Sequence, residues 1–141
     1  MRAMRSDEIR EFLLARPRTA TLATVRADGR PHAAPIWFAM DGDALIFTTW
    51  HTTVKAANLR RDPRVCLVVD DEAPPFAYVQ IEGMASLSED LGELRRWAAV
   101  IAGRYMGPEQ AEAYGVRNGV PGEILVRVTP MRIVAQAEIA V

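Results

Sequence analysis

The chain has 141 residues, 50% of them hydrophobic and 25% charged, and its formal net charge at pH 7 is -1. This length and composition predict one globular domain over residues 1–141 with enough apolar surface for a core. The balanced charge excludes a general nucleic-acid binder, because no basic excess is available to neutralise phosphates. The single cysteine excludes an internal disulfide, and the lack of an apolar run of about 20 residues excludes a membrane helix. The polar N-terminus differs from a signal peptide and favours a cytoplasmic location.

The first third of the chain predicts one helix followed by three strands. Ser6 is a candidate N-cap with acidic residues behind it, and the helical pattern stops before Pro17. From Thr19 the hydrophobic period changes to two, and Asp-Gly dipeptides mark the turns. Pro35 indicates a sheet edge, a bulge or a place where a ligand replaces a neighbouring strand. The expected elements are a helix at 6–13 and strands at 19–25, 30–40 and 44–49.

The remaining two thirds predict two helices and further strands. Thr52 and Thr53 can cap a helix that ends before Pro63, and Ser88 can cap a second helix. The apolar run 65–69 is typical of a strand covered on both faces. The expected elements are helices at 54–61 and 89–104, strands at 65–69 and 76–87, mostly loop at 107–122 with one helical turn at 108–114, and strands at 124–128 and 131–137 interrupted by Pro130.

Six or seven strands joined mostly by tight turns, with helices inserted at two points, are typical of an antiparallel barrel. A doubly wound sheet would need more helical connections between its strands. The predicted fold class is therefore mainly β (α+β), an antiparallel barrel with a few peripheral helices.

The segment FTTWHTTVKAANLRR, which begins at Phe47, is the strongest candidate site. It places threonine hydroxyls, the free N–H groups of a helix N-terminus and the ammonium of Lys55 close together, which suits an anion such as phosphate. Lys55 is the only lysine among 17 basic residues. The alternative is an ordinary capped helix with a solvated lysine, and the residues alone leave both interpretations open.

Three segments in this order resemble a known family. They are TLATVRADGRPHAAPIWF, then FTT-x5-K-A-x-N-L-x-x-D-P-R-V-x-L-V-V, then YVQIEGMAS. The order is similar to the flavin- and deazaflavin-binding split barrels typified by pyridoxamine 5′-phosphate oxidase, and most similar to the actinobacterial branch that binds coenzyme F420. The resemblance spans about residues 8–138. It implies a six-stranded antiparallel split β-barrel of Greek-key type that dimerises, with two cofactor sites at the dimer interface.

The resemblance also implies which residues bind the cofactor. Lys55 corresponds to the lysine that holds the cofactor phosphate, and Thr53 to the adjoining position. Basic side chains at Arg60, Arg61 and Arg64 could meet the acidic tail of F420, or they could be solvated charges. The other implied positions are Thr48, Thr49 and Val54 near the phosphate, Arg30 as a basic position of F420-type members, Pro35, Ile36 and Trp37 along the ring, and Phe76, Tyr78 and Gln80 on the strand that the partner subunit brings to the ring.

Two departures separate this chain from the vitamin B6 oxidases that it resembles. Those enzymes usually carry Ser-Arg-Lys where this chain has Thr53-Val54-Lys55, so one phosphate-binding arginine is lost. The C-terminal Trp/Arg/Pro segment that binds the vitamin is also absent. Both departures argue against the vitamin B6 reaction.

The remaining chemistry-bearing side chains give weaker signals. His51 lies beside the candidate anion-binding residues and is the candidate proton donor, the alternative being a surface histidine. His32 and Cys66 are interpreted as structural. Two histidines and one cysteine supply no metal-binding motif, so no metal is expected.

The resemblance implies a homodimeric oxidoreductase that transfers a hydride between reduced F420 and a small organic substrate such as an enone or a quinone. The first alternative is an FMN-binding oxidoreductase of the same fold. The second is a non-catalytic F420 carrier or a haem-binding split barrel. The expected partners are a second copy of the chain and a small-molecule substrate, with no nucleic acid and no membrane.

Overall fold

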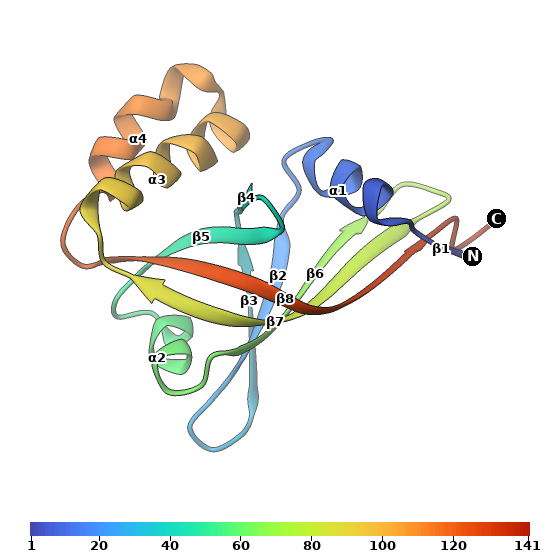
Figure 1. The fold of residues 1–141 in the computed structure, drawn as a ribbon, viewed down its shortest axis with the longest axis horizontal. Coiled ribbons are helices and arrows are strands. Elements are labelled where there is room, and N and C mark those ends of the chain that lie inside the picture. The colour runs from blue at the N-terminus through green and yellow to red at the C-terminus, as the bar shows by residue number, and fades with distance from the viewer.

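The computed structural model describes all 141 residues and places every strand in one antiparallel sheet (Figure 1). The strand order is β3-β2-β6-β7-β8-β5-β4, and β1 pairs with β8. The elements are β1 Arg2–Ala3, α1 Ser6–Leu14, β2 Ala20–Val25, β3 Pro31–Ile36, β4 Ala39–Asp41, β5 Ala44–Trp50, α2 Val54–Arg61, β6 Arg64–Asp71, β7 Ala77–Ser88, α3 Leu91–Met106, a 3-10 turn at Pro108–Gln110, α4 Ala111–Asn118 and β8 Glu123–Ala137. The strand count is eight rather than six, but the architecture is the expected split β-barrel.

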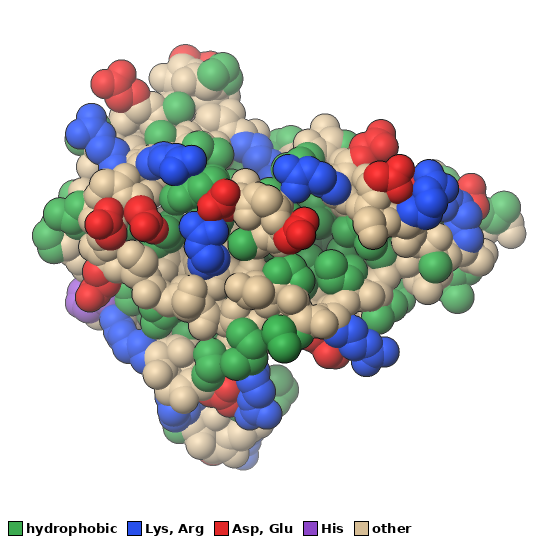
Figure 2. Space-filling view, in the orientation of Figure 1, with side chains coloured by type: hydrophobic (Ala, Val, Ile, Leu, Met, Phe, Trp, Pro, Cys, Tyr) green, Lys and Arg blue, Asp and Glu red, His purple; other side chains and the backbone are tan.

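Two buried apolar clusters form the core. The larger has 18 residues and joins the inner face of the sheet to Leu13 of α1 and to Ala56 and Leu59 of α2. The smaller has six residues and joins α3 to β4, β5 and β8. In Figure 1, α3 and α4 stand together at one end of the sheet, and α1 lies toward the other. A hollow lined with hydrophobic side chains is visible between α1 and the sheet in Figure 2.

Helix α2 begins where the sequence predicts it. Thr53 is the N-cap, and its Oγ1 accepts a hydrogen bond from the backbone N–H of Ala56 at 3.2 Å. The helix ends before Pro63, which cannot continue it. The candidate anion site therefore has the strand–loop–helix backbone on which the prediction depends.

The N-caps predicted for the other two helices are wrong. Helix α1 is capped at Arg5, whose backbone N–H donates to Glu8 at 3.3 Å, and Ser6 is already helical. Helix α3 is capped by Asp90, whose carboxylate accepts from the N–H of Glu93 at 2.9 Å. Ser88 instead accepts from the N–H of Asp90 in the loop before the helix. A carboxylate is the stronger acceptor for the positive end of a helix, which favours Asp90.

The single strand predicted over 30–40 is two strands, β3 and β4, separated by Trp37 and Phe38. The backbone of Phe38 does not continue a strand because side chains of α3 bind it. Its N–H donates to the Tyr105 hydroxyl at 3.1 Å, and its carbonyl accepts from Arg104 at 3.1 Å. The edge position predicted from Pro35 is confirmed, because β3 is an edge strand.

The interruption predicted at Pro130 is also wrong, because β8 runs through it from Glu123 to Ala137. The pairing of β7 with β8 shifts between Glu82 and Gly83, so that Gly83 lies opposite Pro130. Met131 is left out of the pairing and is 71% exposed. A bulge accommodates a residue that lacks an N–H, so the strand bends without ending.

Half of the segment 107–122, predicted as mostly loop with one helical turn, is helix α4, and a 3-10 turn at Pro108–Gln110 precedes it. Two glycines of this segment, Gly115 and Gly119, lie against Arg95 of α3. A Cβ on Gly115 would lie 2.8 Å from the carbonyl oxygen of Arg95, so only glycine lets the two helices approach this closely. Helices α3 and α4, which follow β7 and precede β8 in the chain, form an antiparallel pair (Figure 1).

Strand β6 is covered on one face only within this chain, contrary to the prediction for residues 65–69. Val65, Leu67 and Val69 are buried, whereas Val68 is 36% exposed. The outward face of the sheet also carries Met84, which is 40% exposed.

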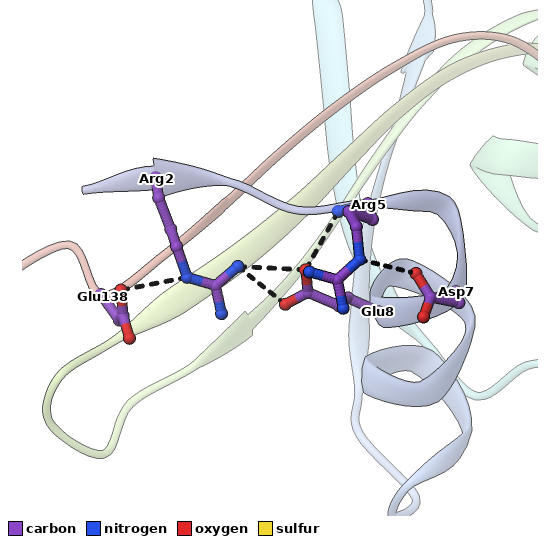
Figure 3. A network of polar contacts seen from close by, with 5 residues as sticks. All are labelled: Arg2, Arg5, Asp7, Glu8 and Glu138. Atoms are coloured by element: carbon purple, nitrogen blue, oxygen red, sulfur yellow. Dashed lines mark hydrogen bonds and ion pairs between the residues drawn. The ribbon is translucent and has the colours of Figure 1, made fainter.

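The N-terminus is tied to the rest of the chain by the charged network in Figure 3. Arg2 bridges Glu8 at 2.8 Å and Glu138 at 3.0 Å, while Arg5 contacts Asp7 and Glu8. Hydrogen bonds from Arg2 and Arg5 lower the pKa of the Glu8 carboxyl. These pairs are exposed and contribute orientation more than stability. None of the helices has both the length and the apolarity to span a membrane.

Candidate functional site

A cavity of about 410 Å³ lies where the start of α2, the end of β3, β5 and the α3–α4 pair meet. That volume falls within the roughly 300–1,000 Å³ typical of small-molecule sites. The cavity brings together five of the residues that sequence analysis singled out and seven that it did not. Its lining residues are Thr19, Pro35, Ile36, Trp37, Thr48, Lys55, Ala98, Ile101, Ala102, Met106, Tyr114 and Asn118.

Lys55 and Thr48 supply the polar side of the cavity. Lys55 lies in the first turn of α2, where backbone N–H groups are not used by the helix, and Thr48 is on β5. An ammonium, a hydroxyl and helix N-terminal amides on one wall can hold an anion. This is the combination on which the phosphate prediction rests.

The other two threonines have hydroxyls that bond within the chain. The Oγ1 atoms of Thr49 and Thr53 lie 2.8 Å apart, and the Thr53 hydroxyl is 3.0 Å from the carbonyl oxygen of Trp50. Thr53 also accepts from the Ala56 N–H, so one hydroxyl can use its donor and both acceptor positions here. Thr49 is 5% exposed. These two residues hold the loop before α2 in place, whereas Val54 is 48% exposed and projects no polar group.

The apolar side of the cavity is formed by the end of β3 and by α3. The Trp37 ring stacks on the Tyr105 ring with centroids 4.8 Å apart and planes at 7°. Tyr105 donates to the Arg18 carbonyl at 2.6 Å, and burial raises the pKa of its hydroxyl. Arg104 donates to the carbonyls of Phe38 and Arg16, and burial lowers the pKa of its guanidinium. The wall is thus fixed to α3 by hydrogen bonds and a ring stack.

None of the arginines predicted near the site lines the cavity. Arg30 lies 3.7 Å from Asp28 at the β2–β3 turn. Arg60 donates to the His51 carbonyl at 3.0 Å, which places it at the loop before α2. Arg61 donates to the Asn58 side chain at 3.2 Å, and Arg64 pairs with Asp62 at 2.7 Å. Hydrogen bonds from Arg64 lower the pKa of Asp62 to about 2.

His51 is exposed beside the cavity rather than in it. Its ring contacts the Trp50 indole edge-on with centroids 4.7 Å apart, and its backbone N–H donates to Gly122 at 2.8 Å. His51 therefore lies beside the start of β8 and is not among the residues that line the cavity.

Phe76, Tyr78 and Gln80 do not line the cavity of their own chain. In the sheet register Pro35 pairs with Thr21, Thr21 with Val68, and Val68 with Gln80. Three strand spacings, about 14 Å, therefore separate Gln80 from Pro35 on the outward face. Phe76 has a φ of 66°, a left-handed conformation that is uncommon for a non-glycine residue, and is 38% exposed.

Sequence reasoning missed the α3–α4 wall and one carboxylate. The stripe of Leu94, Trp97 and Ile101 indicated a core helix, and nothing in it showed that Ile101 also faces a cavity. Glu123 is the first residue of β8, and its Oε2 atom is buried without a hydrogen-bond partner. Burial raises the pKa of the Glu123 carboxyl, while Arg117, His51 and Lys55 act in the opposite direction. An acidic residue at the end of a glycine-rich loop gave no signal of this environment.

Comparison with solved structures finds the same fold with related sequences. A conserved hypothetical protein, Rv2991 of Mycobacterium tuberculosis, superposes with a TM-score of 0.85 and 31% identity, covering 96% of this chain and 86% of that one. An F420 reductase superposes with a TM-score of 0.69 and 30% identity, covering 87% of this chain and 94% of the reductase. The architecture read from the sheet is thus that of known split barrels.

Sequence comparison agrees with the structural one. A curated relative, the pyridoxine/pyridoxamine 5′-phosphate oxidase of Cupriavidus metallidurans, is 36% identical over 77 residues, 54% of this chain. The match spans only a third, 33%, of that oxidase. Residues 6–137 match the sequence family described as pyridoxamine 5′-phosphate oxidase, whose members include flavin-binding oxidoreductases. Since that match takes in both walls of the cavity and every strand of the barrel but the first, the chain belongs to the pyridoxamine 5′-phosphate oxidase family.

Proposed function

We propose that this protein binds coenzyme F420 and transfers a hydride from the reduced deazaflavin to a small organic substrate such as an enone or a quinone. The observation that carries the proposal is the cavity with Lys55 and Thr48 on one wall and Pro35, Ile36 and Trp37 on another. The likeness to an F420 reductase over 87% of the chain supports the choice of cofactor.

The residues present fit such a group. An aromatic ring system with a charged phosphate needs an apolar wall and an anion-binding end, and the cavity offers both. Lys55 would hold the phosphate by charge, without requiring the fork geometry of an arginine. Val54 stands where the vitamin B6 oxidases usually carry an arginine that binds the cofactor phosphate. Its loss weakens phosphate binding, on which FMN would depend more than F420.

The deazaflavin supplies the hydride chemistry, and the protein supplies position and a dry environment. Pro35, Ile36 and Trp37 would fix the ring, because Trp37 is itself held by Tyr105. Ala98, Ile101 and Ala102 of α3 would exclude water from the ring face. His51 is the candidate proton donor from outside the cavity, and solvent is the alternative source.

We further propose that the active form is a homodimer. Val68 and Met84 are exposed apolar residues on the outward face of the sheet, the face to which Tyr78 and Gln80 belong. Because Gln80 is too far from Pro35 in one chain, a second copy is needed to bring Phe76, Tyr78 and Gln80 to a cofactor ring. Light scattering at micromolar concentration should give twice the mass of 15.6 kDa. A monomeric mass with intact cofactor affinity would refute the dimer.

An FMN-dependent oxidoreductase of the same fold is the alternative within the family. A non-catalytic F420 carrier or a haem-binding split barrel is the alternative from another functional class. The absorbance of the protein as purified separates them: one violet band for a deazaflavin, two bands for a flavin, and an intense Soret band for haem.

The decisive experiment is titration with F420, FMN and haem, followed by turnover of reduced F420 with enones and quinones. Tight F420 binding with consumption of reduced F420 supports the proposal. Tight F420 binding without turnover on any substrate class indicates a carrier, and tighter binding of FMN or haem overturns the choice of cofactor.

A further inference from the structure

Glu123 is the first residue of β8 and lies next to the part of the sheet that lines the cavity, although it is not itself a lining residue. It pairs with Trp50 across β5 and β8, two positions from the pair of Thr48 with Leu125. Residues two apart on a strand point to the same face. Glu123 therefore projects on the face of Thr48, which lines the cavity, and Leu125, which packs under α3.

Charged side chains from three segments lie near the Glu123 carboxylate, but one of its two oxygen atoms accepts no hydrogen bond. Its Oε2 is buried and unpartnered. The groups that act on it are Arg117 of α4, His51 of the loop after β5, and Lys55 of α2. Burial nevertheless raises its pKa, so desolvation outweighs these positive charges. A carboxylate with one buried oxygen, on the same face of the sheet as Thr48, would repel an anion that binds beside Lys55.

The number of charges on a phosphate decides how strongly that carboxylate repels it. A phosphomonoester carries about -1.5 to -2 at pH 7, because its second pKa is about 6. A phosphodiester carries one charge at any pH near neutrality. FMN ends in a monoester, whereas the ribityl phosphate of F420 is esterified on both sides. With Thr49 and Thr53 bonded to each other, the cavity has one lysine to set against Glu123.

We propose that Glu123 is a specificity residue that disfavours a doubly charged phosphomonoester and leaves a singly charged phosphodiester as the preferred ligand beside Lys55. This inference rests on the proposed function and deepens it, since it names the phosphate class that the site selects. It would also explain why the acidic side chain of Glu123 lies near a site that is proposed to bind an anion.

The test compares wild-type protein, Glu123→Gln and the control Glu11→Gln. Glu11 is exposed on α1, and its substitution changes the net charge equally. Dissociation constants for F420, FMN and riboflavin, which lacks the phosphate, are measured at pH 7.5 and 0.1 M salt. Glu123→Gln should strengthen FMN binding about tenfold and F420 binding less than about threefold, as one screened charge at short range allows. Riboflavin binding should not change in either variant, and Glu11→Gln should match the wild type.

Two further measurements do not depend on affinity in the variant. In wild-type protein the preference for F420 over FMN should narrow as the pH falls from 8 to 5, because the monoester loses its second charge. Phosphorus NMR of bound FMN should give a lower second phosphate pKa in Glu123→Gln than in the wild type. A purely structural role of Glu123 would leave that pKa unchanged.

The outcomes separate the two levels of inference. If F420 and FMN bind and Glu123→Gln changes neither their ratio nor the phosphate pKa, the proposed function stands and the role of Glu123 is refuted. If neither cofactor binds the wild-type protein, both are refuted. A gain for FMN alone, absent in Glu11→Gln, supports the selection of a phosphodiester.

Discussion

The indole of Trp37 lies parallel to the phenol ring of Tyr105, with ring centroids 4.8 Å apart and planes 7° from parallel. This stack joins the break between the two edge strands to the last turn of α3. Trp37 is 47% exposed on the cavity side, so α3 supports a surface that remains open to a ligand. The cavity wall is consequently a property of α3 as much as of β3.

Removing the Tyr105 hydroxyl should destabilise the protein. Tyr105→Phe keeps the stack but leaves the Arg18 carbonyl and the Phe38 N–H without their partner. The free energy of unfolding should fall by about 1–3 kcal/mol at pH 7, measured by denaturant titration. Since burial raises the Tyr105 pKa, the wild-type advantage is complete below pH 10 and lost above it. Tyr114→Phe, which removes the hydroxyl of a tyrosine that lines the cavity, is the control, and an equal loss there would contradict the assignment.

Removing the Lys55 charge should weaken cofactor binding. Lys55→Met keeps most of the stem, and loss of a hydrogen bond to a charged group corresponds to an affinity about 10- to 150-fold lower. Folding should change little, because a lysine in the first turn opposes the helix dipole. Titration with F420 at constant salt measures the effect.

Lys55→Arg is the matched variant for the same experiment. Its planar guanidinium should also bind less well than the wild type, because it would crowd the bonded pair of Thr49 and Thr53. If Lys55→Met binds the cofactor within about threefold of the wild type, the lysine is only a solvated charge on a capped helix.

Two glycine-to-alanine substitutions should have opposite signs. A Cβ at Gly83 would lie 2.7 Å from the Thr129 carbonyl oxygen and 2.7 Å from Val128 Cγ1, at the β7–β8 bulge. Gly83→Ala should cost about 1–3 kcal/mol as overpacking. At Gly103, inside α3, the new Cβ would meet Ala111 at an ordinary 3.5 Å, so Gly103→Ala should gain about 0.5–1 kcal/mol. Thermal denaturation of both variants tests the pair, and a stabilising Gly83→Ala would refute the close packing.

The stability effect of Glu123→Gln should depend on pH. Because burial raises the folded-state pKa of this carboxyl, its contribution to stability is complete below the unfolded value of about 4.3 and is lost as the pH rises through the folded value. The variant should therefore be more stable than the wild type at pH 8 and lose that advantage by pH 4. Denaturation curves at the two pH values measure this, with Glu11→Gln as the control. If the stability difference between Glu123→Gln and the wild type is the same at both pH values, the raised pKa of Glu123 is contradicted.

The sequence by itself determined the elements whose signals are local. The period-two runs, the Asp-Gly turns and the Thr53 cap followed by Lys55 depend on residues within a few positions of one another, and these features formed as predicted. The meeting of Thr48 and Lys55 in one cavity was predictable for the same reason, since they are seven positions apart on a strand–loop–helix unit.

The tertiary structure decided the features that need contacts between distant segments. Gly115 belongs to a helix because Arg95 lies against it, Pro130 stays in a strand because β7 offers a bulge, and the break at Phe38 exists because Tyr105 binds its backbone. The position of Glu123 has the same origin, because pairing with Trp50 and the approach of Arg117 of α4 put one carboxylate oxygen in a buried place that the sequence does not reveal. Local propensity is a weak preference that such packing overrides, so the second wall of the cavity and its charge balance come only from the folded chain.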